Sequence, residues 1–195
     1  MHWADYTAQR LMERGDEQVS ASGITPSGEF HIGHLREILS AEMIHRACLD
    51  AGMSSKYIFI VDSMDPLRRV YDFLSPEYEQ FIGCPLAYIP APDEDGSPGD
   101  GSVTYADHFL SPFLDSLEQI GVRPEVVMNH ETYERGLFAE YIDSAITNRE
   151  EIRSIIQQIS GRELPHDWFP YNPMGSGGSM DGVTVTGYEK PYVIW

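Results

Sequence analysis

A glycine-rich loop between two apolar segments constrains the fold of this chain more than any other stretch. Residues 22–39 read SGITPSGEFHIGHLREIL, with three glycines, a proline and two histidines ahead of an amphipathic stretch. The residues before the loop, QVSASGI at 18–24, alternate apolar and small side chains as a short strand does. Residues 35–50 repeat apolar side chains at helical spacing, and Gly52 follows where a helix would stop. This order predicts one strand–loop–helix unit of a parallel α/β sheet.

Further apolar segments continue the alternation along the chain. The strands expected are 56–62 (KYIFIVD), 86–90 (LAYIP) and 125–129 (EVVMN). The helices expected are 105–121, 133–147 and 149–160, and residues 93–102 read as a loop. We therefore expect an α/β fold with a parallel sheet. Ligands of such sheets bind beyond the carboxyl ends of the strands, where the glycine-rich loop and Asp62 would lie.

Composition narrows the class of protein. With 195 residues, 42% of them hydrophobic, the chain can bury a real core. Its net charge of −18 disfavours direct binding of nucleic-acid phosphates and suits high salt, a basic partner, or a protein whose basic nucleic-acid-binding part lies outside this chain. The two cysteines, Cys48 and Cys84, form neither a disulfide framework nor a metal pair, and no apolar run reaches membrane length. We expect a cytoplasmic protein with no membrane segment and no bound metal.

The loop has the properties of an anion site. A helix N-terminus offers free N–H groups and a partial positive charge, and Gly28 and Gly33 let a ligand approach the backbone. His31 and His34 stand one helical turn apart, and both can donate to phosphate oxygens. Neither a Walker A loop nor G-x-G-x-x-G occurs. The alternatives are a plain pair of surface histidines, or a metal pair that lacks a third ligand at convincing spacing.

Two acids and two arginines follow the expected strand 56–62. A carboxylate at Asp62 could pair with a cationic substrate group or a ribose hydroxyl. Asp65 precedes Pro66, an arrangement that favours a helix N-cap. Arg68 and Arg69 suit phosphate or tRNA, although two arginines in a polar segment are more often only solvated.

Several stretches together resemble a known family. PSGEFHIGH is similar to the HIGH signature of class I aminoacyl-tRNA synthetases. The longer stretch ASGITPSGEFHIGHLREIL, with VDSMDPLRRV, YADHF and HWADYTAQRLMERG, resembles the class I lysyl-tRNA synthetases of archaea and some bacteria, up to about residue 161. The resemblance implies a Rossmann-like parallel sheet of the HIGH-motif nucleotide-binding superfamily, truncated here. It also implies use of ATP with Mg²⁺, formation of lysyl-adenylate, and transfer of lysine to tRNA(Lys).

The resemblance assigns residues by position. It makes His31 and His34 the catalytic contacts to the ATP phosphates and packs Gly33 on adenine. The rest of the implied ATP-binding set is Pro26, Ser27, Gly28, Glu29, Phe30 and Ile32. Gly23 and Thr25 match positions of the lysine pocket, and we expect Asp62 beside them. His108 matches a zinc position of some members, but the preceding loop has no cysteine, so we expect a plain helix histidine.

One family signature is missing. Class I synthetases carry a second, lysine- and serine-rich loop of the MSKS type, whereas the only lysines here are Lys56 and Lys190. We expect residues 1–164 to be the HIGH-containing half of the catalytic domain. Residues 165–195, rich in proline and glycine, would form a linker and the start of an inserted connective region, with a small β element from 183. The alternatives are an incomplete or non-catalytic nucleotide-binding lobe, inactive alone, and a small HIGH-type nucleotidyltransferase.

Overall fold

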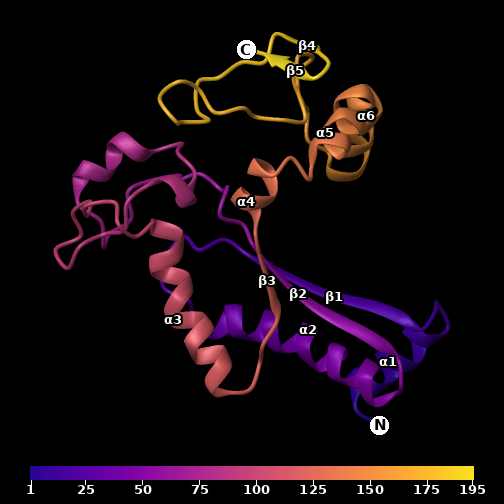
Figure 1. Ribbon diagram of the computed structural model, residues 1–195. Helices are drawn as coiled ribbons and strands as arrows, with labels where there is room; N and C mark the ends of the chain where they lie inside the picture. The colour runs from indigo at the N-terminus through magenta and orange to yellow at the C-terminus, as the bar shows by residue number, and fades with distance from the viewer.

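A three-stranded parallel sheet forms the centre of the molecule (Figure 1). The computed structural model describes residues 1–195. The strands are β1 (Glu17–Ile24), β2 (Ser54–Val61) and β3 (Glu125–Met128), in the order β1-β2-β3. Ile24 pairs with Val61, and Val61 pairs with Met128, so all three strands end at the same edge. The parallel α/β expectation is confirmed, and this edge is where such sheets place their ligands.

Two of the first three helices, α2 (Ile32–Asp50) and α3 (Tyr105–Gln119), pack against the sheet, and the other, α1 (Trp3–Met12), packs against α2. The main core joins Ile38 of α2 and Phe113 of α3 to the buried alternate residues of β2, which are Tyr57, Phe59 and Val61. The strand period of two therefore turns these three side chains toward the helices. No helix is long and apolar enough to cross a bilayer.

A second core joins residues 67–89, between β2 and α3 in the chain, to Tyr105, Ala106 and Phe109 of α3. It contains two short 3₁₀ helices, η1 (Pro76–Phe81) and η2 (Leu86–Tyr88). The prediction of a strand at 86–90 is wrong, because η2 occupies it and only an isolated bridge between Pro90 and Thr104 remains. Pro85 and Pro90 bound the run and cannot donate to a ladder, so its apolar residues are buried without sheet pairing.

The segment after Asp62 also departs from prediction. No helix begins at Pro66, so the N-cap assignment of Asp65 is wrong. The backbone N–H of Leu67 donates to the Cys84 carbonyl oxygen, and Leu67 in turn accepts from the Gly83 N–H, at 2.9 and 2.8 Å. The chain is therefore held extended against residues 83–84 and does not coil, which leaves the Asp65 carboxylate available to another partner.

Three helices follow β3: α4 (Asn129–Glu134), α5 (Ala139–Thr147) and α6 (Arg149–Ser160). The continuous helix predicted over 133–147 is wrong, because the chain breaks at Gly136, whose φ of 67° lies in the left-handed region. The prediction of a helix at 149–160 is confirmed. It ends at Gly161, also left-handed, as helix C-termini commonly do.

The C-terminal segment ends in a small hairpin of β4 (Gly187–Glu189) and β5 (Tyr192–Ile194). The segment folds back onto the rest of the chain at two points, as Figure 1 shows in yellow above α4 and α5. The Met180 N–H donates to the Gly83 carbonyl oxygen at 2.8 Å, and the Tyr188 hydroxyl donates to Asp143 Oδ1 at 2.8 Å.

Candidate active site

The two histidines of the glycine-rich loop cap helix α2 together. His31 is the N-cap residue, and its Nδ1 accepts from the Gly33 N–H at 3.1 Å. His34 Nδ1 accepts from the His31 N–H at 3.0 Å, which closes a capping box. The ring centroids lie 4.0 Å apart. Because both Nδ1 atoms accept, each neutral ring carries its proton on Nε2, which remains free to donate to a ligand.

The two histidines differ in their exposure to solvent. His31 is exposed, whereas His34 is half-buried, and burial followed by the neighbouring His31 lowers the pKa of His34. The first turn of α2 contains no acidic residue. An anion at this helix end therefore meets the positive end of the helix dipole and two N–H donors, without a competing carboxylate in the turn.

Gly33 is required by the fold of His31. A Cβ added at Gly33 would lie 2.8 Å from Cε1 and 2.9 Å from Nδ1 of the His31 ring. A contact this short forces the ring out of its capping position. The missing side chain thus makes room for the first histidine, in addition to any room it leaves for a nucleotide.

The loop ahead of α2 is held by the protein core. Pro26 is fully buried, and the Ser27 carbonyl oxygen accepts from the Tyr105 hydroxyl at 2.8 Å. Gly28 faces the ring of Phe73, which would lie 3.5 Å from an added Cβ. These contacts place the backbone of residues 26–28 before any ligand binds.

Phe30 links the loop to the histidines. Its ring stacks on Phe113 of α3 with centroids 4.3 Å apart, and it lies 5.0 Å from the His34 ring. Glu29 and Ile32, on either side of this anchor, are exposed. The predicted ATP-binding residues therefore form one continuous stretch before α2, in which Pro26 is buried and Phe30 packs on α3.

A second polar group gathers where β1 and β2 end. Asp62 Oδ1 accepts from Asn129 Nδ2 at 2.7 Å, while its Oδ2 lies 3.5 Å from the position a Cβ would take on Gly23. The Gly23 N–H donates to Glu37 Oε1 of α2 at 3.1 Å. Two carboxylates thus flank Gly23, one from the strand end and one from the helix.

Asp65 brings a third carboxylate to this place. Its Oδ2 accepts from the Thr25 hydroxyl at 2.6 Å, so the residue misassigned as a cap instead fixes Thr25. Burial raises the pKa of Asp62, and the charges of Asp65 and Glu37 raise it further, against the hydrogen bond from Asn129. A cation bound among these acids would relieve their mutual repulsion.

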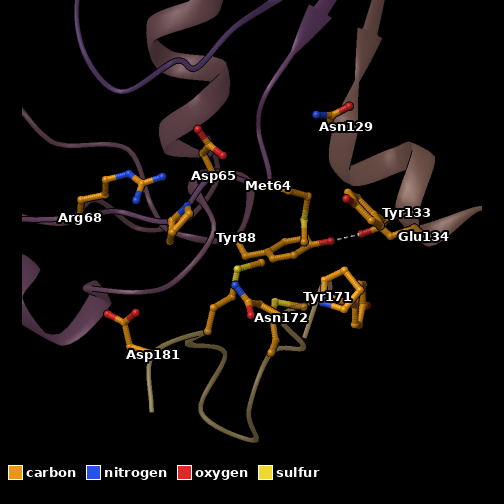
Figure 2. A pocket seen from close by; sticks show the side chains of 14 residues that line it. Met64, Asp65, Arg68, Tyr88, Asn129, Tyr133, Glu134, Tyr171, Asn172 and Asp181 are labelled. Atoms are coloured by element: carbon orange, nitrogen blue, oxygen red, sulfur yellow. Dashed lines mark hydrogen bonds between the residues drawn. The ribbon is translucent and has the colours of Figure 1, made fainter. Parts of the chain in front are cut away.

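A cavity of about 600 Å³ opens beside these acids (Figure 2). Asp65 and Asn129 line one side of it, and Tyr88, Tyr133 and Tyr171 line the rest together with several methionines and prolines. We call it the tyrosine cavity. Its volume lies in the range of pockets that bind small molecules.

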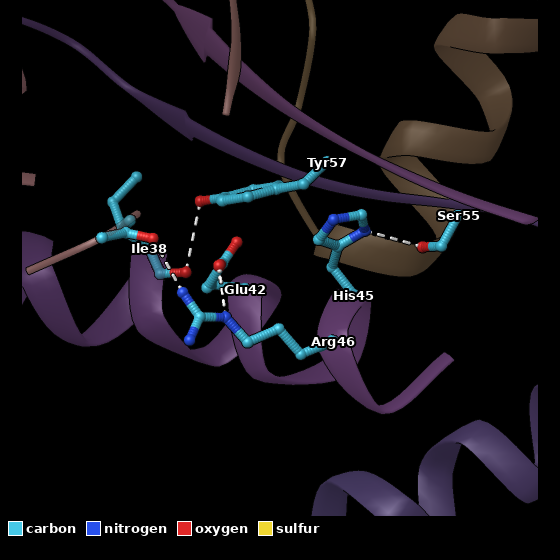
Figure 3. Close-up of polar contacts among 7 residues, drawn as sticks. Ile38, Glu42, His45, Arg46, Ser55 and Tyr57 are labelled. Atoms are coloured by element: carbon cyan, nitrogen blue, oxygen red, sulfur yellow. Dashed lines mark hydrogen bonds and ion pairs between the residues drawn. The ribbon is translucent and has the colours of Figure 1, made fainter. Parts of the chain in front are cut away.

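An ion pair between a buried carboxylate and a half-exposed arginine stabilises α2 (Figure 3). The Glu42 side chain, 9% exposed, accepts from Arg46 Nε at 2.6 Å, and an Arg46 amino group donates to the Gly121 carbonyl oxygen at 2.8 Å. The Tyr57 hydroxyl of β2 donates to the Ile38 carbonyl oxygen at 3.2 Å. The Tyr57 bond ties α2 to the sheet, and the Arg46 bond ties it to the turn after α3, so both help to fix the helix that carries the two histidines.

Comparison with known proteins assigns the chain to a family. The profile of the tRNA synthetases class I (K) matches residues 1–195. The chain belongs to this family. The chain is 39% identical over 190 residues to lysine–tRNA ligase 1 of Methanosarcina acetivorans, covering 97% of this chain and 34% of the relative. It is 40% identical over 196 residues to lysine–tRNA ligase of Archaeoglobus fulgidus, covering 100% and 38%.

The Methanocaldococcus jannaschii lysine–tRNA ligase is 43% identical over 174 residues, covering 88% of this chain and 32% of the relative. The chain thus spans about a third of the length of the curated relatives it matches. In the structure, His31 and His34 lie together at the N-terminal end of α2. The structure brings Gly23, Thr25 and Asp62 together at the adjoining strand ends, and their roles remain predictions.

Two of the polar residues around the ends of β1 and β2, Glu37 and Asn129, were not predicted from the sequence. Glu37 is one of several polar residues in an amphipathic helix, and the sequence gives no sign that its side chain accepts from Gly23, fourteen positions earlier. Asn129 had a usable signal, because it directly follows a parallel strand, as Asp62 does.

The other candidate residues have plainer surroundings. His108 is an exposed residue of α3, and no three His, Cys, Asp or Glu side chains gather to hold a metal ion. Arg69 lies over the ring of Tyr71 at 5.1 Å, whereas Arg68 lines the tyrosine cavity.

Proposed function

We propose that this chain is the catalytic lobe of a lysine–tRNA ligase. It binds ATP and lysine and forms lysyl-adenylate, and the full-length enzyme then transfers lysine to tRNA(Lys). The observation that carries the proposal is the pair of capping histidines at the N-terminus of the 19-residue helix α2. Family membership and relatives that are lysine–tRNA ligases support it.

The helix end suits a nucleotide triphosphate. His31 and His34 would donate from Nε2 to phosphate oxygens, and the free N–H groups of the first turn would add their partial charge. Residues 26–30 and Ile32 would support the rest of the nucleotide beside Gly33. Magnesium would arrive with the phosphates of ATP, since the protein offers no three-ligand site of its own.

The strand ends suit a cationic amino acid. Asp62, Asp65 and Glu37 surround Gly23 and Thr25, and lysine brings two ammonium groups that acids of this kind attract. Burial, and then the charges of Asp65 and Glu37, raise the pKa of Asp62, and a bound ammonium group would act against all three by stabilising the ionised carboxylate.

The proposed chemistry needs no covalent bond to the protein. A lysine carboxylate oxygen attacks the α-phosphorus of ATP, the bond from that phosphorus to the bridging oxygen breaks, and pyrophosphate leaves. A terminal ribose hydroxyl of tRNA then attacks the carbonyl carbon, and AMP leaves. The lobe contributes by orienting the reactants and by donating to the oxygens on which charge develops.

A second candidate is a lobe that binds nucleotide without turning it over. Lysines of the second class I signature would stabilise the leaving phosphates, but Lys56 is exposed on β2 and Lys190 pairs with Asp143. Neither residue lies at the helix end. In that case the remaining part of a longer protein would supply the missing cations.

The domain division remains part of the proposal. Residues 1–164 would form the nucleotide-binding half, and 165–195 would begin an inserted connective region, consistent with its irregular backbone and terminal hairpin. We place the activity in the cytoplasm, because both cysteines are buried free thiols, as a reducing compartment allows.

ATP–pyrophosphate exchange tests the proposal, with each amino acid supplied separately to the 195-residue chain. We expect exchange with lysine alone, and a loss of more than tenfold in His31→Asn and His34→Gln. His2→Ala is the matched control, since His2 caps α1 by a similar capping box. No exchange, with ATP binding that depends on His31 and His34, would favour the second candidate. No ATP binding at all would refute both.

A further inference from the structure

We infer that Asn129 selects lysine over arginine at the proposed amino-acid site, because its amide occupies one oxygen of the Asp62 carboxylate. The inference rests on the proposed function, since it concerns the amino acid that the reaction uses. Val61 pairs with Met128 at the ends of β2 and β3, so the next residue of each strand, Asp62 and Asn129, meet at the same edge of the sheet. Asn129 acts on the amino acid through Asp62 and is therefore a positioning residue.

Three carboxylates gather at the ends of β1 and β2, and each has one oxygen that accepts from a protein donor. The pairs are Asp62 Oδ1 with the Asn129 amide, Asp65 Oδ2 with the Thr25 hydroxyl, and Glu37 Oε1 with the Gly23 N–H. The second oxygen of each carboxylate takes part in no hydrogen bond within the protein. This place therefore offers a ligand single oxygens from three different carboxylates.

Single oxygens suit an ammonium group better than a guanidinium group. The lysine ammonium group is compact and carries three donors that point in different directions, so each donor can meet a different carboxylate. The arginine guanidinium group is planar, and it binds best when two parallel N–H groups meet both oxygens of one carboxylate. At Asp62 such a fork would have to share Oδ1 with the Asn129 amide, whose nitrogen lies 2.7 Å away.

The residue after Asn129 holds this amide in place. The His130 N–H donates to Ser63 Oγ at 3.2 Å, and Ser63 Oγ lies 2.9 Å from His130 Nδ1. Ser63 is fully buried, and Figure 2 shows Asn129 where β3 leads into α4. Two successive residues of α4 thus bond two successive residues after β2, so the Asn129 amide lies against Asp62 before an amino acid binds. Moving it aside for a guanidinium group would break its bond to a charged oxygen.

Isothermal titration calorimetry of the 195-residue chain with L-lysine and with L-arginine tests the inference. We expect the parent to bind lysine at least about tenfold more tightly than arginine. Asn129→Ala frees Asp62 Oδ1, so arginine should gain affinity and the ratio of the two affinities should fall at least about fivefold. Asn129→Leu should lower the ratio in the same way, because leucine fills a similar volume and has no donor.

The matched control is Asn148→Ala, since Asn148 Nδ2 donates to the Ser144 carbonyl oxygen at 2.8 Å at the junction of α5 and α6. Its ratio of lysine to arginine affinity should equal that of the parent. A purely structural role of Asn129 would weaken the binding of both amino acids alike, so the ratio separates selection from folding.

The ¹³C resonance of the Asp62 carboxyl group gives a readout that needs no amino acid. Burial raises the pKa of Asp62 and the bond from Asn129 lowers it, so the pKa of Asp62 should rise further in Asn129→Ala. The same titration in Asn148→Ala should match the parent.

Separate outcomes distinguish the inference from the proposed function. An unchanged affinity ratio in both Asn129 variants, or an unchanged pKa of Asp62 in Asn129→Ala, would overturn the inference. Equal loss of both affinities would also overturn it, because Asp62 would then hold the α-ammonium group that lysine and arginine share. In each of these cases, selective binding of lysine by the parent would leave the proposed function standing. Binding of neither amino acid by the parent would overturn the inference together with the lysine part of the proposed function.

Discussion

The capping histidines allow helix capping and ligand binding to be separated by mutation. His31→Asn keeps an acceptor at the N-cap, and His34→Gln keeps one at the third helical position, so both preserve the capping box but lose Nε2. We expect the free energy of unfolding of each variant to stay within about 0.5 kcal/mol of the parent. His31→Ala removes the cap and should cost about 0.5–2 kcal/mol.

In the two cap-preserving variants, the affinity for ATP should fall although the stability is kept. A hydrogen bond from Nε2 to a charged phosphate contributes about 1.5–3 kcal/mol, so each cap-preserving variant should bind ATP about 10- to 150-fold more weakly. Isothermal titration calorimetry with Mg²⁺ measures the affinity, and urea unfolding measures the stability. His2→Ala should lose stability and bind ATP normally, because His2 Nδ1 accepts from the Ala4 N–H at 3.3 Å on a different helix.

The same titration has a pH dependence of known sign. Burial and His31 lower the pKa of His34 below its ordinary value of 6.5, so the free ring is neutral at pH 7. Bound phosphates favour the protonated ring, so ATP affinity should rise as the pH falls below neutrality, and this rise should be absent in His34→Gln. Cap-preserving variants that bind ATP as the parent does at every pH would show that the histidines are helix caps only.

Three further predictions concern the structure around the site. Gly33→Ala should lower ATP affinity with a net change in stability of no more than about 1 kcal/mol in urea, because the loss of the His31 cap, about 0.5–2 kcal/mol, is offset by about 1 kcal/mol from the helix preference of alanine. Asp62 binds its proton more tightly in the folded than in the unfolded chain, so its ionisation lowers the free energy of unfolding as the pH rises above 3.8. Asp62→Asn should therefore be more stable than the parent at pH 7 in urea unfolding, with a gap that closes below pH 3.8, and a persistent gap would contradict the assignment. Arg46→Ala should cost about 1–3 kcal/mol in urea unfolding, since it leaves the buried Glu42 carboxylate unpaired, and an unchanged midpoint would refute that.

The sheet could be predicted from the sequence because its signals are local. Alternation in 18–24 and the apolar run in 56–62 both reappear as strands within two residues of the expected ends. Their parallel pairing follows from the helical stretch between them, since a crossover helix returns the chain to the same end of the sheet. The start of α2 at Ile32 was less visible, because its first turn holds Gly33 and His34 in place of apolar residues.

Errors arose where distant partners decide the backbone. The run at 86–90 is apolar and, apart from Tyr88 and the half-buried Pro90, buried, but burial alone does not separate a strand from a 3₁₀ turn bounded by prolines. Asp65 looks like a helix cap beside Pro66, yet its partner is Thr25, forty residues earlier. The Asp65-Pro66 dipeptide alone carries no information about a contact between residues forty positions apart, so it predicts only the local cap.

The acidity of the chain is compatible with binding ATP because charge is distributed unevenly around the site. With a net charge of −18, the protein as a whole repels a nucleotide, and this repulsion weakens beyond about 10 Å at ordinary salt. Binding therefore depends on short-range groups, and the first turn of α2 is free of acids and carries two histidines. The carboxylates of Asp62, Asp65 and Glu37 lie instead around Gly23 and Thr25, where the proposed substrate is a cation. The two proposed substrates would thus meet groups of opposite charge, one at the first turn of α2 and the other around Gly23, so the overall charge says little about which ligand each place prefers.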